Sequence, residues 1–257
     1  MKLKTLALAA ALAAATLPAA ANIVTTGTIG QAEYVLLVSN ASGSYAQDLG
    51  ITTDQVQALL NGGGSFSQTV AGTQWSNFQA YNGTNSKWSV IAAQPIGPGY
   101  LPGDINTWTT VAAGQKLGGL LTSQVNDGTS NLAVHFQDID NRAAILGIAL
   151  PNSRVASPNT SVAWSSPAVM TFSSYFDTRN VIGASASMVY MTTGGFDGFQ
   201  PAQYNVLATS ANRNFTASFD GTTVSIAAVT AVPEPSSYAM LAAGLLAIGF
   251  VARRRQS

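Results

Sequence analysis

The feature that most limits how this chain can fold is an apolar run near its C-terminus. Ser236 to Ala252 are 17 consecutive uncharged residues, and Arg253, Arg254 and Arg255 follow at once. As a helix the run would span roughly 25 Å, close to the shortest length that crosses a bilayer. Three arginines would hold the C-terminal end on the cytoplasmic side. We therefore expect a membrane-anchoring helix here, with Tyr238, Gly244 and Phe250 inside it, rather than a buried core helix.

A short motif precedes this run. Pro233, Glu234 and Pro235 follow Val232, and the two prolines prevent a helix immediately before the apolar segment. The order of Pro-Glu-Pro, apolar helix with a central glycine and terminal arginine cluster resembles the PEP-CTERM sorting signal, over about the last tenth of the chain.

This resemblance implies an exported protein of a Gram-negative bacterium that makes extracellular polysaccharide. It also implies a partner, the membrane enzyme exosortase. Exosortase would cleave near the Pro-Glu-Pro and release the body or transfer it to the cell surface. Pro233, Glu234 and Pro235 would then belong to a substrate and not to a catalyst.

The N-terminus has the three parts of a secretory signal peptide at residues 1–21. Lys2 and Lys4 are basic, Leu6 to Leu17 is apolar, and Ala19 and Ala21 form a small-residue cleavage site before Asn22. The alternative, an uncleaved anchor, fits less well because the apolar run is short. We expect the Sec machinery and signal peptidase as partners. The protein would be anchored in the inner membrane during sorting and then lie at the cell surface or outside the cell.

The body between these segments, residues 22–232, is long enough for one extracytoplasmic domain. It holds 6 basic and 10 acidic residues, a net charge of −4. An acidic body offers no electrostatic surface for nucleic acid, so we expect no such partner. The chain has no cysteine, which excludes disulfides, thiolate metal sites and a cysteine nucleophile. We expect no cofactor.

Periodicity predicts a β-rich α+β fold, one globular domain with antiparallel sheets and a few short helices. Thr52 and Gln55 form a capping box that predicts a helix at 53–60, and Trp75 and Phe78 mark another helical turn. Residues 120–150 fit both helix and strand spacing, and we favour a helix with Ser130 as N-cap. We expect a polar connection at 151–167. Strand character is seen at 34–38, 87–92, 107–112, 168–175, 185–192 and 203–209.

The C-terminal half should supply much of the sheet. Its clearest signal is a hairpin, because Asp220-Gly221 separates two alternating runs, 215–219 and 224–226.

Three sets of residues could carry chemistry in the body. His135, the only histidine, could act as a base with Asp138 or Asp140, but no Gly-x-Ser-x-Gly elbow accompanies it, so a structural role is favoured. Asp138 and Asp140 are also weak candidates for a calcium site that Asp177 and Asp197 could complete, yet the glycine and distal glutamate of an EF-hand are absent.

The third set could stack on sugar rings, although aromatics at strand spacing are more often core: Trp75, Trp88, Trp108, Trp164, Tyr81, Tyr100 and Tyr175.

These observations favour a non-enzymatic surface or extracellular-matrix protein with a structural or adhesive role linked to exopolysaccharide and biofilm. The alternatives are a secreted carbohydrate-binding module and, more distantly, a secreted hydrolase centred on His135. We expect no catalytic residues if the protein is a structural or adhesive component, and none if it is a carbohydrate-binding module.

Overall fold

A computed structural model of the protein describes residues 23–80, 85–97, 99–146, 153–156, 171–173 and 176–229. The expected signal peptide and the apolar C-terminal segment lie outside these residues. Three helices are described, α2 (Thr53–Asn61), α3 (Thr73–Ala80) and α4 (Thr122–Leu146). The strands are β1 (Glu33–Asn40), β2 (Gly43–Thr52), β3 (Ser65–Thr69), β4 (Lys87–Pro95), β5 (Ile105–Thr110), β6 (Ser153–Ala156), β7 (Thr171–Ser173), β8 (Phe176–Asp177), β9 (Asn180–Val181), β10 (Ser185–Thr192), β11 (Gln203–Val206), β12 (Asn214–Phe219) and β13 (Thr223–Val229).

One large sheet organises the body. Its strands follow the order β3-β13-β12-β10-β5-β4-β1-β2-β6, with β11 beside β10 and β9 beside β4, and the strand pairs are antiparallel. β7 and β8 form a separate pair. The fold is thus β-rich with an antiparallel sheet, as predicted. The C-terminal half supplies much of the sheet, as expected, through β6 and β9–β13, while the central strands β5, β4, β1 and β2 come from residues 33–110.

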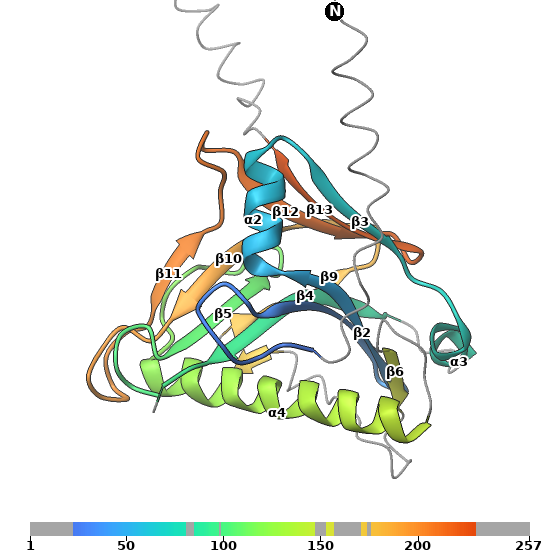
Figure 1. Cartoon of the computed structure of the whole chain (residues 1–257), viewed down its shortest axis with the longest axis horizontal. Coiled ribbons are helices and arrows are strands. Elements are labelled where there is room, and N and C mark those ends of the chain that lie inside the picture. Colours follow the sequence, from blue (N-terminus) through green and yellow to red (C-terminus); the bar gives the residue numbers. More distant parts are fainter. Residues whose placement is uncertain are drawn as a thin grey trace, which may run out of the picture.

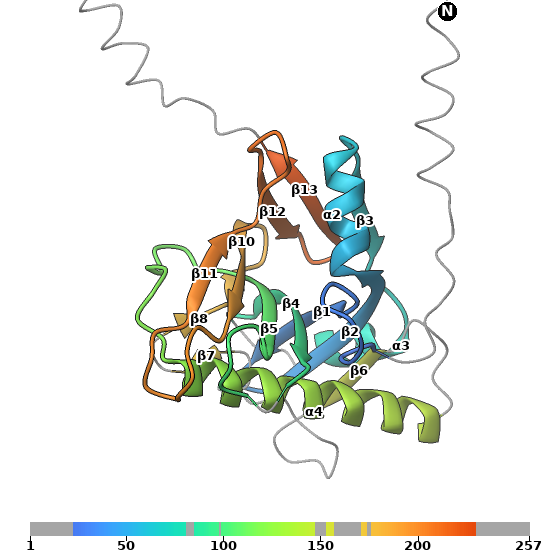
Figure 2. The ribbon, with the colours of Figure 1, turned by 60° about the vertical axis from the view of Figure 1, so that its left-hand side comes forward.

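The sheet has an apolar core on each face. Alternate side chains of β1 point to opposite faces, so Leu36 joins a core that α2, α3 and the β12–β13 hairpin complete, while Leu37 joins a second core under α4. All eight residues of β1 are buried for this reason. Figures 1 and 2 show α4 running beneath this part of the sheet and α2 lying away from it, beside β3 and β13.

Helix α2 begins where the sequence predicts. The Thr52 hydroxyl accepts a hydrogen bond from the Gln55 backbone N–H at 3.2 Å, and the Gln55 side chain accepts one from the Thr52 N–H at 2.9 Å. This reciprocal pair satisfies two N–H groups that the first turn leaves unpaired. Val56 and Leu60 are then buried on one face of the helix.

The ambiguous segment after residue 120 is helical, but its predicted start is wrong. Helix α4 begins at Thr122, and Ser130 lies inside it, its hydroxyl donating to the Asn126 side chain at 3.3 Å. Val125 lies seven residues before Leu132 and extends the apolar face of the helix by two turns. Both residues are buried. With 25 residues, α4 also contradicts the expectation of short helices only.

Other expectations at the strands are met or refined. β12 and β13 form the predicted hairpin, in which the Asp220 carboxylate accepts from the N–H groups of Thr222 and Thr223, both at 2.7 Å. Gly221 has φ +98°, a conformation that favours glycine. The predicted connection at 151–167 contains a strand, β6, which pairs with β2. No described helix is long and apolar enough to cross a membrane.

Candidate functional site

A pocket of about 350 Å³ lies beside β10, where its neighbour β5 ends. β5 pairs with β10 only from Met188 to Thr192, and one further hydrogen bond joins the Val111 N–H to the Ser187 carbonyl at 2.9 Å. After Val111 the chain leaves the sheet as a loop. The opposite edge of β10 changes partner at the same level, from β12 to β11. The pocket therefore forms where the strands around β10 separate.

The polar groups of this pocket are neutral. Its polar side chains are the amides Gln115, Asn180 and Asn214 and the hydroxyls of Ser185 and Ser187, and the remainder is apolar or glycine. None of the described residues that line it carries a charge. Amides and hydroxyls donate and accept without the desolvation cost of an ion. Such a lining suits a neutral polar ligand.

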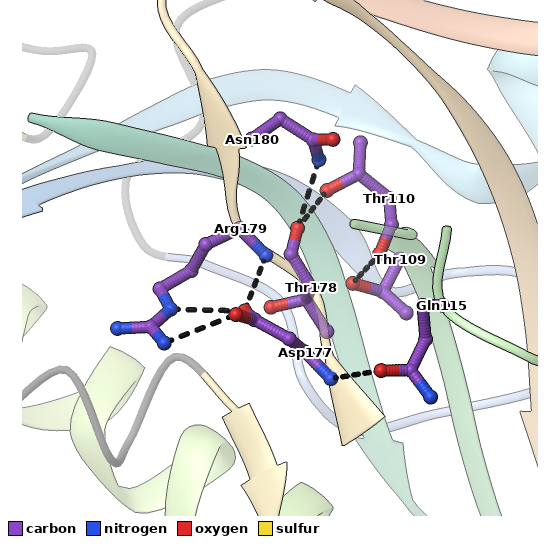
Figure 3. A network of polar contacts seen from close by, with 7 residues as sticks. All are labelled: Thr109, Thr110, Gln115, Asp177, Thr178, Arg179 and Asn180. Carbon is purple, nitrogen blue, oxygen red and sulfur yellow. Dashed lines mark hydrogen bonds and ion pairs between the residues drawn. The ribbon is translucent and has the colours of Figure 1, made fainter. Parts of the chain in front are cut away.

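An ion pair adjoins the pocket and fixes one of its walls (Figure 3). The Arg179 guanidinium donates to the Asp177 carboxylate through Nε at 2.9 Å and Nη2 at 3.0 Å, and the Arg179 backbone N–H adds a third bond at 2.9 Å. The Asp177 backbone N–H in turn donates to the Gln115 side chain at 3.1 Å, and its carbonyl accepts from the Ala112 N–H at 2.9 Å. The loop that follows β5 is thereby tied to β8.

Burial opposes ionisation of the Asp177 carboxyl, but the hydrogen bonds from Arg179, together with the Arg179 and Lys87 charges, outweigh it and lower its pKa. Asp177 is therefore ionised at neutral pH and already paired. Because a general base must be able to take a proton near the operating pH, this carboxylate is suited to holding structure rather than to proton transfer.

A second part of the network orients Asn180. The Thr178 carbonyl accepts from the Thr110 hydroxyl at 2.9 Å and from the Asn180 side-chain amide at 3.1 Å (Figure 3). Thr178 is fully buried and Asn180 nearly so. The amide that lines the pocket is thus held in one orientation by β5 and the segment between β8 and β9, as a binding group requires.

Three of the four tryptophans expected on a sugar-stacking surface are instead core residues. Trp75, Trp88 and Trp108 are at most 7% exposed and belong to the same apolar cluster. Trp75 contacts Phe219 with ring centroids 5.7 Å apart, and Trp88 contacts the same ring at 6.4 Å. That part of the stacking hypothesis is wrong, because all three rings pack into this apolar core instead of facing solvent. Trp164, Tyr81 and Tyr175 lie outside the described residues, whereas Tyr100 is 43% exposed.

His135 is half-buried on α4, between the exposed Val134 and the buried Phe136. The side chains of Asp138 and Asp140 lie outside the described part of the chain, so their roles as triad members or calcium ligands stay predictions. Asp177, proposed with them, is engaged by Arg179. Within the described residues no three His, Asp or Glu side chains gather in a way that could hold a metal ion.

Among the described residues, the most exposed aromatic side chains were not among those expected to bind sugar. Phe196 and Phe199, in the loop between β10 and β11, are 77% and 85% exposed. The signal was present in the sequence, since both lie in the run Gly194-Gly195-Phe196-Asp197-Gly198-Phe199, which has no apolar alternation. Large apolar rings in a glycine-rich loop have no strand or helix face on which to be buried.

The predicted processing residues lie beyond the described part of the chain, and a comparison with known proteins covers the segment that contains them. The family model of the PEP-CTERM protein-sorting motif matches residues 231–255. No curated protein and no solved structure shows a significant match to the chain. The matched segment includes Pro233, Glu234, Pro235 and the three arginines, and it begins two residues after Val229, the last residue of β13. The chain thus carries a C-terminal PEP-CTERM protein-sorting motif, the mark of an exported exosortase substrate that is sorted to the cell surface.

Proposed function

We propose that this protein is a non-enzymatic surface or extracellular-matrix component with a structural or adhesive role in an exopolysaccharide biofilm. The observation that carries the proposal is the sorting motif at residues 231–255, which follows β13 almost directly. Exosortase processing would deliver the β-rich body as the product. Ala19 and Ala21 would mark the first cut, before Asn22, and Pro233 to Pro235 the second.

The architecture supports a role in which the folded protein has to persist outside the cell, rather than one in which it converts a substrate. The body contains no cysteine, so its stability outside the cell rests on packing and hydrogen bonds. Apolar cores cover both faces of the central strands, and threonine hydroxyls tie neighbouring segments together inside the protein. A domain built in this way suits a long-lived extracellular component.

Intact-mass analysis of protein recovered from the cell surface and the medium tests the sorting step. We expect a chain that begins at Asn22 and ends near Pro233, or that carries an added group at that end. A mass running from Asn22 to Ser257 would show a plain membrane anchor and contradict processing. Glu234→Ala should block processing, and Ser236→Ala, just outside the Pro-Glu-Pro, is the matched control.

The role itself is tested in the producing bacterium. A strain that lacks the protein should form a less cohesive biofilm, measured as detachment under shear, and the wild-type gene should restore it. A variant without residues 233–257 should be made but fail to restore cohesion. Unchanged cohesion in the deletion strain would contradict the structural role. His135→Ala should restore cohesion fully, and its failure to do so would favour the hydrolase alternative.

A second candidate function, a carbohydrate-binding module, is favoured by the neutral pocket beside β10. Its amides and hydroxyls match the donors and acceptors of an uncharged saccharide. Ser187→Leu would fill the pocket from a strand position where the side chain is exposed. Binding of a neutral oligosaccharide on a glycan array that this variant loses would support the module, and an array without signal would contradict it.

A further inference from the structure

Two neighbouring loops present large apolar side chains to solvent. The loop between β4 and β5 contributes Tyr100 and Leu101, 43% and 44% exposed, and the loop between β10 and β11 contributes Phe196 and Phe199. Solvent-exposed apolar side chains that gather in one place commonly mark an interaction site. We call these four residues, together with Asp197, the aromatic loop pair.

Hydrogen bonds hold the two loops against each other. The Thr193 hydroxyl donates to the Leu101 carbonyl at 2.6 Å, and the Gly103 N–H donates to the Thr193 carbonyl at 3.2 Å. Gly198 lies directly beside Tyr100, because a Cβ at this position would be 3.3 Å from an atom of the tyrosine ring. The exposed rings of both loops therefore belong to one surface.

The β10–β11 loop is also fixed to the start of α4. The Thr122 N–H donates to the Gln200 carbonyl at 2.8 Å, and the Ser123 N–H donates to the Gly198 carbonyl at 3.1 Å. Figures 1 and 2 show this loop beside the first turn of α4, far from the β12–β13 hairpin that leads into the sorting motif. The aromatic loop pair is thus attached to a rigid element and lies away from the end of the body that is processed.

A carboxylate lies between the two phenylalanines. Asp197 Oδ1 accepts hydrogen bonds from the N–H groups of Phe199 and Gln200, at 2.9 and 3.1 Å. Within the described residues its other carboxylate oxygen has no hydrogen-bond partner. A ring surface next to an unused acceptor matches a sugar, whose C–H face packs on an aromatic ring while its hydroxyls donate from the edge.

We propose that the aromatic loop pair binds a neutral polysaccharide chain, with Phe196 and Phe199 stacking on successive sugar rings and Asp197 accepting hydroxyl hydrogen bonds. The proposal rests on the adhesive role proposed above and names the class of ligand. Asp104, whose carboxylate accepts from the Leu101 N–H at 3.0 Å, and Asp197 place negative charge beside these rings, which disfavours acidic polysaccharides.

A lipid surface fits the same residues less well. Insertion of Phe196 and Phe199 into hydrocarbon would carry the exposed Asp197 with them, and burying an unpaired carboxylate is costly. A second copy of the chain would bring two such carboxylates to one interface. A polysaccharide remains hydrated around its hydroxyls, so the carboxylate keeps its water or exchanges it for sugar hydroxyls.

Affinity electrophoresis of the mature protein in native gels tests the proposal, with dextran, hydroxyethyl cellulose and galactomannan as neutral probes and alginate as an acidic one. Wild-type protein should be retarded by at least one neutral probe and not by alginate. Each of Phe196→Ala and Phe199→Ala should weaken binding roughly 2- to 10-fold. Phe196→Trp should retain it. Val181→Ala, which removes another exposed apolar side chain, should bind as wild type.

Several results would overturn the proposal. In the gels, they are no retardation by any neutral probe, or retardation that the double variant F196A/F199A leaves unchanged. Flotation with phosphatidylcholine vesicles that is lost in F196A/F199A would instead indicate a lipid surface. A dimer in light scattering that becomes a monomer in F196A/F199A would indicate a second copy of the chain. Retardation lost in Ser187→Leu but kept in F196A/F199A would move the site to the pocket beside β10. Normal retardation with undiminished biofilm cohesion in the deletion strain would count against the adhesive role alone.

Discussion

The hydroxyls of Thr107 and Thr129 lie 2.5 Å apart and are fully buried between β5 and α4. This hydrogen bond is a polar contact inside the apolar core that α4 covers. The bond joins the central strand β5 to α4, a segment whose residue spacing alone fits either a helix or a strand. Because a buried hydroxyl without a partner is costly, the contact disfavours arrangements in which α4 is shifted along the sheet.

Thr129→Val is expected to lower the free energy of unfolding by about 1–3 kcal/mol, since it leaves the Thr107 hydroxyl buried without a partner. The double variant T107V/T129V should recover to within about 1 kcal/mol of wild type, because it removes both polar groups while preserving their shape. Urea denaturation of the three proteins measures the difference. A double variant less stable than T129V would show that the hydroxyls have other partners.

The Arg179–Asp177 pair predicts a pH-dependent stability. Arg179→Met should cost about 0.5–1 kcal/mol at pH 7, as expected for a partly exposed ion pair. The folded-state pKa of Asp177 lies below its ordinary value of 3.8, so the pair stabilises the fold above that value. This contribution is lost as the pH falls through the folded-state pKa.

The difference between wild type and Arg179→Met in urea denaturation should therefore shrink between pH 5 and pH 2.5. Arg213 provides the control, since it forms no ion pair within the described residues, and Arg213→Met should show no such trend. A pH-independent cost for Arg179→Met would mean that lost packing, not charge, explains it.

The capping box of α2 gives a prediction at the start of that helix. Thr52→Ala should destabilise the protein by about 1 kcal/mol, because it removes the acceptor for the Gln55 N–H. Thr52→Ser keeps a hydroxyl at the same position and should stay within about 0.5 kcal/mol of wild type. Thermal unfolding followed by circular dichroism compares them. Equal melting temperatures for all three proteins would show that the cap contributes nothing.

Local patterns predicted local elements well. Thr52 and Gln55 located α2, and Asp220 and Gly221 located the β12–β13 hairpin, because in both cases the signal and the structure involve the same few residues. The β-rich antiparallel fold was predicted for the same reason. The order of the strands was not, since it depends on pairings such as β3 with β13, whose residues are far apart in the chain.

Burial of individual residues was harder to predict, and the choice of candidate binding residues depends on it. Trp88 and Phe196 are both large aromatic residues, yet one is fully buried and the other is 77% exposed. The difference arises from their surroundings, a central strand for Trp88 and a glycine-rich loop for Phe196. β2 was also missed, because Gln47 and Asp48 interrupt its apolar pattern although both are buried in the sheet. The sorting motif was predicted from the sequence, because its three parts follow one another in a single short stretch of residues.

The apolar face of α4 provides the strongest test of the second core. Phe136 is fully buried, and two residues earlier Val134 is 66% exposed on the opposite side of the same helix. Phe136→Ala should cost about 3–5 kcal/mol through the lost burial and the cavity it leaves. Val134→Ala should change stability by no more than about 0.5 kcal/mol. Guanidinium denaturation of both variants measures the contrast. Similar costs for the two would mean that α4 does not pack on the sheet through Phe136, and the helix would then have to be rotated about its axis.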